Sequence, residues 1–465
     1  MVHIRSFSRR LLPAALALTL GFGITSCEKI LDVEPKASLD SSTGLKTPAD
    51  LMAGLRGAYD AVQSVNYYGL RYQLFADLAA DNARHTGTFP SFGDIAKGGI
   101  LPDNTEVTAM WNTIYMAINR VNYVIQEAEK LNDPSFDKNG AIAEARALRA
   151  FHYMNLLAYW GGSAQGYGYP DGLGVPLRLT PTTSITGEEI KPKARNTEAE
   201  VVEAIRADLD FAEQNLTSSS VGAGGLNLGG VLALRARLEL RLRNYAAASA
   251  YAEKVDTEWG ISINADYGTL FSQKNSSESI WELPFDAVDA NQLAFFWFPA
   301  AYGGRNEVDP ATGLGPAHEA GDLRRSVNVS TSPSGTTRKY SRIATSDDNV
   351  ILVRGGEVVL TWAEALAQQG QLEQAAELVN IIRARAGLAA LAADVTADQA
   401  KLVTAILKER RVELANEGFR WFDLRRTGLV LATLPAITQD FRTLWPIPQR
   451  EILISNGIIT QNPGY

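Results

Sequence analysis

The sequence feature that most constrains the fold is a stretch near the end of the chain, residues 409–426, which reads ERRVELANEGFRWFDLRR. It mixes many charged side chains with large apolar ones over a few helical turns. A surface helix rarely carries so many large apolar side chains, and an ordinary core helix rarely carries so many arginines. The stretch therefore predicts a buried corner between two helices, in which Gly418 ends the first helix through a left-handed conformation.

The acidic residues of this corner allow two interpretations. Glu409, Glu413 and Glu417 are spaced by four residues, so they share one helical face, where they can act as the acid and base of a glycosidase or pair with nearby arginines. These arginines are Arg410, Arg411 and Arg420, which can alternatively cap backbone carbonyls. Guanidinium groups keep carboxylates ionised, whereas a general acid needs a raised pKa. We therefore favour a structural ion-pair network, with Glu413 and Trp421 inside the core.

The same stretch closely resembles the C-terminal signature of the SusD/RagB family, E-R-R-x-E-L-x-x-E-G-x-R-W-F-D-L-R-R. The end of the chain, WPIPQREI at residues 445–452 and QNPGY at residues 461–465, is also similar to that family's terminus. Further similarities lie at residues 144–151, 276–282 and 322–325. The resemblance covers nearly the whole mature chain. It implies a SusD-like, mostly α-helical fold with no enzymatic activity and no cofactor.

Composition excludes several other classes of function. The chain has 44 Lys and Arg against 52 Asp and Glu, a formal net charge of -8, whereas nucleic-acid binding needs a basic patch. One cysteine rules out an internal disulfide, and the four histidines show no metal-ligand spacing, so no metal site is predicted. The sequence has no P-loop, serine-hydrolase, zinc-protease or dinucleotide motif, so no catalytic residue is predicted.

The N-terminal residues 1–26 have the architecture of a lipoprotein signal peptide. Three arginines precede an apolar run over residues 11–24, which is too short to span a bilayer comfortably. An apolar residue and two small ones then precede Cys27, and this arrangement resembles a bacterial lipobox with Cys27 as the lipidated first residue. Residues 27–46 are predicted to be a lipidated N-terminal tether, and residues 47–465 a single SusD-like domain.

Helical patterns fill most of this domain. Thr47 and Thr197 are each placed to cap a helix, with an acidic residue three positions later. Residues 231–255 and 358–386 each indicate a helix, a turn and a second helix, with small residues around the turn. Both segments resemble tetratricopeptide (TPR) hairpins.

The segment between these two hairpins differs in composition, being richer in Gly, Ser, Asn and Pro. We therefore expect a TPR-like helical hairpin scaffold over about residues 47–258 and 350–465, and an irregular loop-rich lobe over about residues 259–349. A hairpin of this kind buries its apolar face only by stacking on neighbours. The two hairpins are therefore expected to pack together although they are far apart in the sequence.

The candidate ligand-binding residues are aromatic and polar side chains in segments without a regular helical pattern. Aromatic rings are chosen because they stack on broad apolar faces at low entropy cost. They are Tyr67, Tyr68, Arg71, Asp81, Asn82 and Trp297. Alternatives stay open for each group. The run around Trp297 fits a buried strand equally well, and Asp81 and Asn82 are placed to cap a helix. Arg71 can also be tied to Asp81 as a structural pair. In the SusD/RagB family the groove is shallow and its aromatic residues vary, so the resemblance assigns no ligand residue.

The resemblance implies a surface-exposed outer-membrane lipoprotein that binds nutrient and delivers it to a SusC-like TonB-dependent transporter. The usual ligands of the family are oligosaccharides, and a peptide ligand is the alternative. Two other functions stay open: a TPR-type envelope scaffold lipoprotein and a lipoprotein glycosidase. The expected partners are thus the transporter, the oligosaccharide or peptide, and the membrane through the lipid anchor, with no nucleic acid.

Overall fold

A computed structural model of the chain describes residues 44–184, 186–216, 218–222 and 224–465. The predicted signal peptide, the predicted lipidation site Cys27 and most of the predicted tether lie outside the described residues. Residues 45–465 form one unit with extensive internal contacts. Among the helices of the described part, none is long and apolar enough to cross a membrane.

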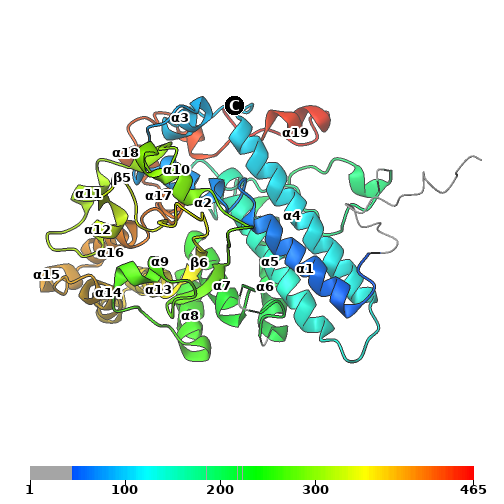
Figure 1. Cartoon of the computed structure of the whole chain (residues 1–465), viewed down its shortest axis with the longest axis horizontal. Helices are drawn as coiled ribbons and strands as arrows, with labels where there is room; N and C mark the ends of the chain where they lie inside the picture. The colour runs from blue at the N-terminus through cyan, green and yellow to red at the C-terminus, as the bar shows by residue number, and fades with distance from the viewer. Residues whose placement is uncertain (1–43, 185, 217, 223) are drawn as a thin grey trace, which may run out of the picture. The chain divides into compact units, whose positions relative to one another are not determined.

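Helices dominate the described chain, as Figure 1 shows. The longer helices are α1 (Pro48–Gln63), α2 (Arg71–Leu78), α4 (Thr105–Lys130), α5 (Lys138–Trp160), α6 (Glu198–Asn215), α7 (Leu228–Arg241), α8 (Tyr245–Lys254), α13 (Gly355–Gln368), α14 (Leu372–Arg385) and α16 (Gln399–Glu413). The short helices are α3 (Pro90–Ala96), α9 (Tyr267–Ser272), α10 (Leu293–Trp297), α11 (Leu314–Ala317), α12 (Arg325–Asn328), α15 (Ala393–Thr396), α17 (Arg420–Arg426), α18 (Val430–Thr433) and α19 (Gln449–Ile454). The 3₁₀ turns are η2 (Glu188–Ile190), η4 (Ala300–Tyr302) and η5 (Asp440–Thr443), and η3 (Val255–Trp259) is a π-helical turn. The strands are β1 (Ala83–His85), β2 (Ser279–Leu283), β3 (Val308–Pro310), β4 (Ser330–Thr331), β5 (Ser334–Thr336) and β6 (Val350–Arg354).

Local sequence explains where two of the long helices begin. At the start of α1, the backbone N–H of Asp50 donates to the Thr47 hydroxyl at 3.2 Å, and the Thr47 N–H donates to the Asp50 carboxylate at 3.0 Å. Thr197 and Glu200 form the same capping box at the start of α6. Each box satisfies backbone N–H groups that a first helical turn leaves unpaired. Both predicted helix starts are confirmed.

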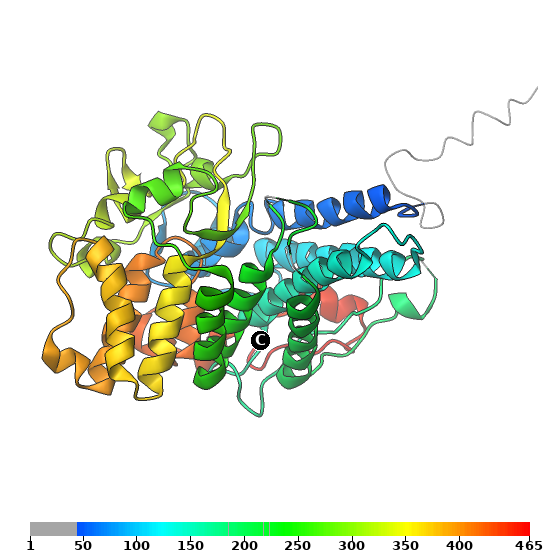
Figure 2. The same ribbon diagram turned by 90° about the horizontal axis from the view of Figure 1, so that it is seen from below.

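The long helices pack as a series of neighbours. α4 packs on α5, α5 on α6, α6 on α7, α7 on α8, and α8 on α13, which also packs on α14. Figure 2 shows the green helices α7 and α8 beside the yellow helix α13. The turns inside the two hairpins have residues with positive φ, Arg243 at 60° and Gly370 at 80°. The prediction of a mostly helical fold with TPR-like hairpins is confirmed.

The two hairpins meet through small side chains. Ala248 of α8 and Ala365 of α13 are both fully buried and lie in one apolar cluster with Leu240. Beside them, the Gln369 side chain donates to the hydroxyl of Ser249 at 3.0 Å. Short side chains let the two helix backbones approach closely, so segments separated by a long insertion form one continuous scaffold.

The lobe between the hairpins is held at its base by two strands. β2 pairs antiparallel with β6, and Leu283 lies opposite Val350. Within the lobe, β4 pairs with β5, while β3 pairs with β1 from the N-terminal part of the chain, with Ala83 opposite Pro310. The lobe therefore contacts the scaffold at its base and again at the segment that follows α2. In Figure 2 its yellow-green loops lie on one side of the hairpin helices.

Candidate functional site

The corner at residues 409–426 is built from α16 and α17, as predicted, but the first helix ends earlier than expected. α16 ends at Glu413, so Glu417 lies in the turn that follows instead of on the same helical face. Gly418 has a φ of 85°, and a Cβ on it would lie 2.6 Å from the Cα of Gln73. Glycine is therefore required here both by the backbone conformation and by the close approach of α2.

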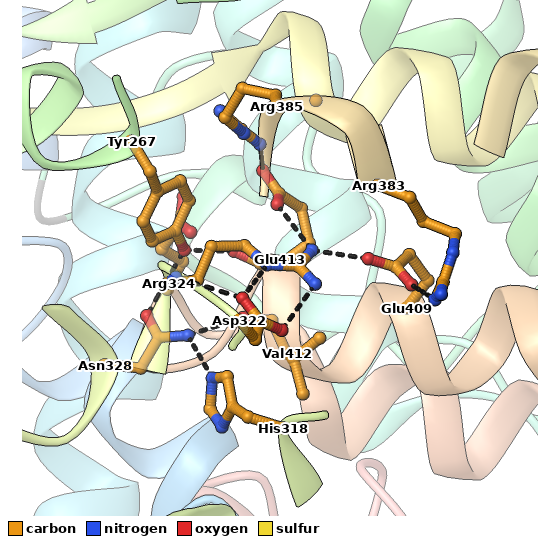
Figure 3. A network of polar contacts seen from close by, with 12 residues as sticks. Tyr267, His318, Asp322, Arg324, Asn328, Arg383, Arg385, Glu409, Val412 and Glu413 are labelled. Atoms are coloured by element: carbon orange, nitrogen blue, oxygen red, sulfur yellow. Dashed lines mark hydrogen bonds and ion pairs between the residues drawn. The ribbon is translucent and has the colours of Figure 1, made fainter. Parts of the chain in front are cut away.

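Glu413 is at the centre of a buried network of ion pairs, part of which is shown in Figure 3. Its carboxylate lies 3.1 Å from Arg324, 2.7 Å from Arg354 and 2.5 Å from Arg385. The Tyr267 hydroxyl donates to its backbone carbonyl at 2.5 Å. Burial alone would raise the pKa of Glu413, but the guanidinium groups of Arg385, Arg354 and Arg324 outweigh burial and hold this pKa well below its usual range.

The same network joins the lobe to the scaffold. Arg324, from the lobe, also lies 2.6 Å from Glu409 of α16. Lys339, from a later part of the lobe, lies 2.5 Å from Glu417. Because these charges are buried, each depends on its partner across the junction, so the lobe is fixed at this corner.

The arginines of the corner have other partners than predicted. Arg410 lies 3.2 Å from Asp423, which belongs to α17. Arg411 and Arg420 pair instead with Asp81, at 2.9 and 2.6 Å. Pairing of these arginines with the glutamates of their own stretch is therefore wrong, whereas the alternative of capping a backbone carbonyl is met by Arg411, which donates to the carbonyl of Asp81 at 3.0 Å. Arg411 lies two residues from both Glu409 and Glu413 on α16, so its side chain leaves the helix on another face and its partner comes from another segment.

This geometry does not support a glycosidase at the corner. The side chains of Glu409, Glu413 and Glu417 are at most 5% exposed. Arginine and lysine side chains surround them, so no pair of carboxylates borders a space that could hold a sugar ring and a water molecule. No group of three or more His, Cys, Asp or Glu residues in the described chain is placed to hold a metal ion.

Two of the predicted ligand-binding residues, Tyr67 and Tyr68, lie in the core. Tyr67 is 0% exposed and accepts a hydrogen bond at 2.6 Å from Asn155 on α5, while its hydroxyl lies 3.1 Å from a ring nitrogen of His152. Tyr68 is 6% exposed, and its ring stacks on Phe151 with centroids 5.4 Å apart. These rings pack the turn before α2 against α5 and are almost entirely covered.

The predicted polar residues are held in ion pairs. Arg71 pairs with Glu106 at the start of α4, and not with Asp81 as we considered. Asp81 pairs with both Arg411 and Arg420, so it joins the segment after α2 to the corner. Arg71 and Asp81 keep about a fifth of their side-chain surface exposed, 19% and 22%. They are the two predicted residues that a ligand can reach.

Asn82 and Trp297 are also buried. Asn82 is 1% exposed and donates to Asp77 at 3.2 Å. Trp297 is 1% exposed and ends the short helix α10, so the aromatic run around it is not a strand, and Phe295 of the same run is partly exposed. A short apolar run does not distinguish a strand from a buried helical turn. The role of the six residues in ligand binding stays a prediction, but the burial of Tyr67, Tyr68 and Trp297 argues against stacking on those rings.

Aromatic side chains are accessible elsewhere on the lobe, at a surface that we call the Phe89–Arg305 surface. It consists of Thr88, Phe89 and Arg305, of Phe295, whose carbonyl accepts from the Arg305 N–H at 2.6 Å, and of Tyr302 in the turn just before Arg305. Tyr302 is 54% exposed, and Phe89 and Phe295 are partly exposed. The guanidinium carbon of Arg305 lies 3.7 Å from the centroid of the Phe89 ring, and Arg305 also donates to the Thr88 hydroxyl at 3.2 Å. The surface therefore combines open rings with a fixed cation and a hydroxyl group.

The buried carboxylate of Glu307 holds this surface in place. It accepts hydrogen bonds from Arg305 at 2.9 Å and from the Phe89 backbone N–H at 2.7 Å, and it lies 2.9 Å from His85. The backbone also approaches closely, since a Cβ on Gly87 would lie 2.3 Å from the Glu307 carboxyl. The pairing of β1 with β3 brings these two loops together. Glu307 thus positions both Arg305, close to it in the chain, and Phe89, which is more than 200 positions away.

The prediction from sequence missed this surface, although two signals were present. Phe89 lies outside any helical pattern, between Thr88 and Pro90. Tyr302 precedes Gly303, whose φ is 89°, so it occupies the end of a turn where a ring is not covered. What the sequence could not reveal is the pairing of β1 with β3, which places the two loops side by side.

Comparisons with known proteins agree with this architecture. The family model "SusD family" matches residues 322–435, and the family model "Starch-binding associating with outer membrane" matches residues 29–222. The chain is 28% identical to SusD-like protein P38 of Formosa agariphila, covering 97% of this chain and 98% of that protein. It is 25% identical to SusD-like protein P2 of the same organism, covering 94% and 96%.

Solved structures share the fold. A SusD superfamily protein from Bacteroides thetaiotaomicron superposes with a TM-score of 0.76 at 24% identity, covering 90% of this chain and 100% of that one. A laminarin binding SusD-like protein superposes with a TM-score of 0.74 at 21% identity, with the same coverage. Two family models match separate parts of the chain, full-length relatives match nearly all of it, and the fold agrees. The chain is therefore similar to the SusD/RagB family along nearly its whole length.

Proposed function

We propose that this protein is a lipid-anchored protein of the outer-membrane surface that binds an oligosaccharide at the Phe89–Arg305 surface and delivers it to a SusC-like TonB-dependent transporter. Members of its family are binding proteins and not enzymes. The matching family description names starch binding and association with the outer membrane, and one relative of known structure is described as laminarin binding. These descriptions support a saccharide as the class of ligand.

The observation that carries the proposal is the combination of side chains at this surface. The exposed ring of Tyr302 offers an apolar face to the C–H groups of a sugar ring. Arg305 and Thr88 offer hydrogen-bond donors for sugar hydroxyls, and Arg305 is already fixed by Glu307. Little side-chain entropy is therefore lost when a ligand binds.

The small number of contacts that this surface offers suits delivery. A protein that passes its ligand to a transporter must release it quickly, and affinity differences of this kind are expressed mainly in the dissociation rate. Stacking on a few rings with a small number of polar contacts gives modest affinity without enclosing the ligand. Loops that a rigid scaffold positions are the usual place for such contacts.

The test is a screen of glycan and peptide arrays, followed by calorimetry with the ligand that binds. Tyr302→Ala is expected to weaken binding by about 1 kcal/mol, a roughly fivefold increase in Kd, because it removes one stacking face. Tyr302→Phe keeps the ring and should retain most of the affinity. Ile381→Ala, which removes a side chain 47% exposed on α14, serves as a control with unchanged affinity.

Each alternative predicts a different result. Selective binding of peptides in the array would assign the chain to the peptide-binding members of the family. Equal affinity in Tyr302→Ala and the wild type would place the ligand elsewhere. Delivery to a transporter requires an exterior location, so protease treatment of intact cells should remove the domain, and a large β-barrel transporter should copurify with it. A protected domain without a transporter would favour an envelope scaffold.

A further inference from the structure

A concave surface lies where the base of the lobe meets the scaffold, and it shares no residue with the Phe89–Arg305 surface. It is bordered by the segment that precedes α7, by the π-helical turn η3 and by the start of β2. Its volume is about 400 Å³, within the range of small-molecule sites. Serine, asparagine and glycine residues form most of its wall, together with two tryptophans. We call it the Trp259 cleft.

Trp259 is the exposed tryptophan of the described chain, at 43%. It is the last residue of η3, where the N–H of Gly260 donates to the carbonyl of Val255 at 2.9 Å, and π-helical turns often occur at functional sites. A Cβ on Gly229 would lie 2.4, 2.6 and 2.6 Å from the indole atoms Cγ, Cδ1 and Cδ2. These similar distances place the face of the five-membered ring against the bare backbone at the start of α7. One face of the indole is thus supported, and the ring is held as a platform.

The wall of the cleft contains two buried polar atoms without a partner. Glu282 is 6% exposed, and its Oε1 accepts hydrogen bonds from the Asn275 backbone at 3.0 Å and from Asn349 at 2.6 Å. Its Oε2 is buried and has no hydrogen-bond partner, and the same is true of the hydroxyl oxygen of Ser279. A buried polar atom left unpaired costs about 1–3 kcal/mol, so a ligand in the cleft that supplied the missing hydrogen bonds would be stabilised by them.

The chemistry of the wall limits the class of ligand. A carboxylate accepts hydrogen bonds and a serine hydroxyl both donates and accepts, so the ligand must carry several hydroxyl groups. None of the described side chains that line the cleft is basic, and Glu282 carries a negative charge. An anionic sugar would have no cation to pair with and would face a carboxylate. An apolar ring face with hydroxyls at its edge matches the indole platform and the polar atoms behind it.

We propose that the Trp259 cleft is a second binding site, which takes a neutral saccharide by stacking it on Trp259 and hydrogen-bonding its hydroxyls to Glu282 and Ser279. The inference goes beyond the proposed function, because it adds a site formed by other elements of the chain. Nothing in it depends on binding at the Phe89–Arg305 surface. The two sites can therefore be tested separately.

The experiment uses the full chain and three probes: maltohexaose and laminarihexaose as neutral saccharides, and hexagalacturonate as an anionic one. Binding is followed by tryptophan fluorescence and by calorimetry, which also gives the number of sites. The starting protein carries Tyr302→Ala, so that binding at the Phe89–Arg305 surface is already weakened in every variant that is compared. Thermal unfolding of each variant verifies that it is folded.

A neutral hexasaccharide is expected to change the tryptophan emission of this protein, and hexagalacturonate is not. Adding Trp259→Ala should abolish the change in emission and weaken binding at this site about tenfold, since both the platform and its contacts are lost. Ser279→Ala should weaken binding severalfold without altering emission in the free state, because its hydroxyl has no partner inside the protein.

Gly229→Ala is the sharpest variant, because it keeps Trp259 and displaces its ring. The lost packing of the indole is partly offset because alanine favours a helix more than glycine does, so the variant should stay folded while saccharide binding falls. Unchanged affinity and number of sites in Trp259→Ala and Ser279→Ala would overturn the proposal. So would the absence of any response to both neutral probes in the starting protein, or tighter binding of hexagalacturonate than of either neutral probe.

Discussion

Among single residues, Glu413 depends most on its surroundings. Its carboxylate is 0% exposed, and three guanidinium groups from the lobe, β6 and α14 surround it. A carboxylate transferred from water to such a place is stable only if its charge is matched and its lone pairs are bonded. Glu413 therefore connects three segments that the chain alone does not bring together.

Glu413→Ala is expected to lower the free energy of unfolding by about 3–5 kcal/mol, because Arg324, Arg354 and Arg385 would keep buried charges with too few partners. Urea denaturation measured by circular dichroism gives this quantity. Glu373→Ala, on the exposed side of α14, is the matched control, and surface substitutions of this kind change stability by less than about 0.5 kcal/mol. Equal midpoints for the two variants would contradict a structural role for Glu413.

His152 is a second residue whose charge is set by burial. It is 0% exposed beside Tyr67, and burial lowers its pKa from 6.5 to about 3. The unfolded chain takes up a proton below pH 6.5, whereas the folded chain does not until about pH 3. The stability that depends on neutral His152 is therefore complete above pH 6.5 and decreases as the pH falls toward 3.

His152→Gln removes this titration while keeping a polar group near Tyr67. At pH 7 the variant should be less stable than the wild type because the ring no longer fills its space. Between pH 6.5 and pH 4 the difference should shrink by about 3 kcal/mol, since only the wild type loses about 1.4 kcal/mol per pH unit through this group. Urea denaturation across this range measures the effect, and parallel pH profiles would show that His152 is not kept neutral.

The burial of a single side chain could be predicted where neighbouring charges indicate it. It could not be predicted where a distant segment covers the side chain. Glu413 and Trp421 were expected in the core from the density of arginine around them, and they are 0% and 1% exposed. Tyr67 and Trp297 were expected in a groove, but aromatic rings fill cores as often as they line sites. Tyr67 is buried by α5, where its partner His152 lies 85 positions further along the chain. No local sequence pattern predicts such a contact.

At the scale of elements, the contact between α8 and α13 explains how two distant hairpins form one scaffold. The helices approach through Ala248 and Ala365, where longer side chains would separate the backbones. The hairpins could be predicted from their small-residue pattern, because that pattern is local. The partners of the short lobe strands could not, because β1 and β3 are brought together by tertiary contacts alone.

Ala248→Leu is expected to destabilise the protein by about 1–3 kcal/mol, because extra methylene groups overpack a filled interface. Ala250→Leu places the same side chain on the exposed side of α8 and should have little effect. Thermal unfolding of the two variants compares them directly. If Ala250→Leu proves as destabilising as Ala248→Leu, the helix itself and not its packing on α13 is the cause.

At the scale of the whole molecule, the predicted lipid anchor determines where the protein acts. Cys27 lies outside the described residues, and its lipidation stays a prediction. Cys27→Ala should move the protein from the membrane fraction to the soluble fraction. Two or three acyl chains hold a protein stably at a membrane, and the lipid on Cys27 is the one membrane anchor that we predict. Fractionation and immunoblotting measure this shift. The thermal midpoint should not change, and a variant that stays with the membrane would contradict the lipoprotein prediction.

The pairing of β2 with β6 has a consequence for how such a protein changes over generations. Leu283 and Val350 are opposite each other, so the intervening chain leaves the scaffold and returns to it about 5 Å apart. Lengthening a loop with closed ends is inexpensive, at about 0.6 kcal/mol for each doubling. As long as Arg324 and Lys339 keep their buried partners, insertions and exchanges around Tyr302 leave the hairpins intact. If these loops bind the ligand as proposed, their exchange alters ligand preference among related proteins at a small cost in stability.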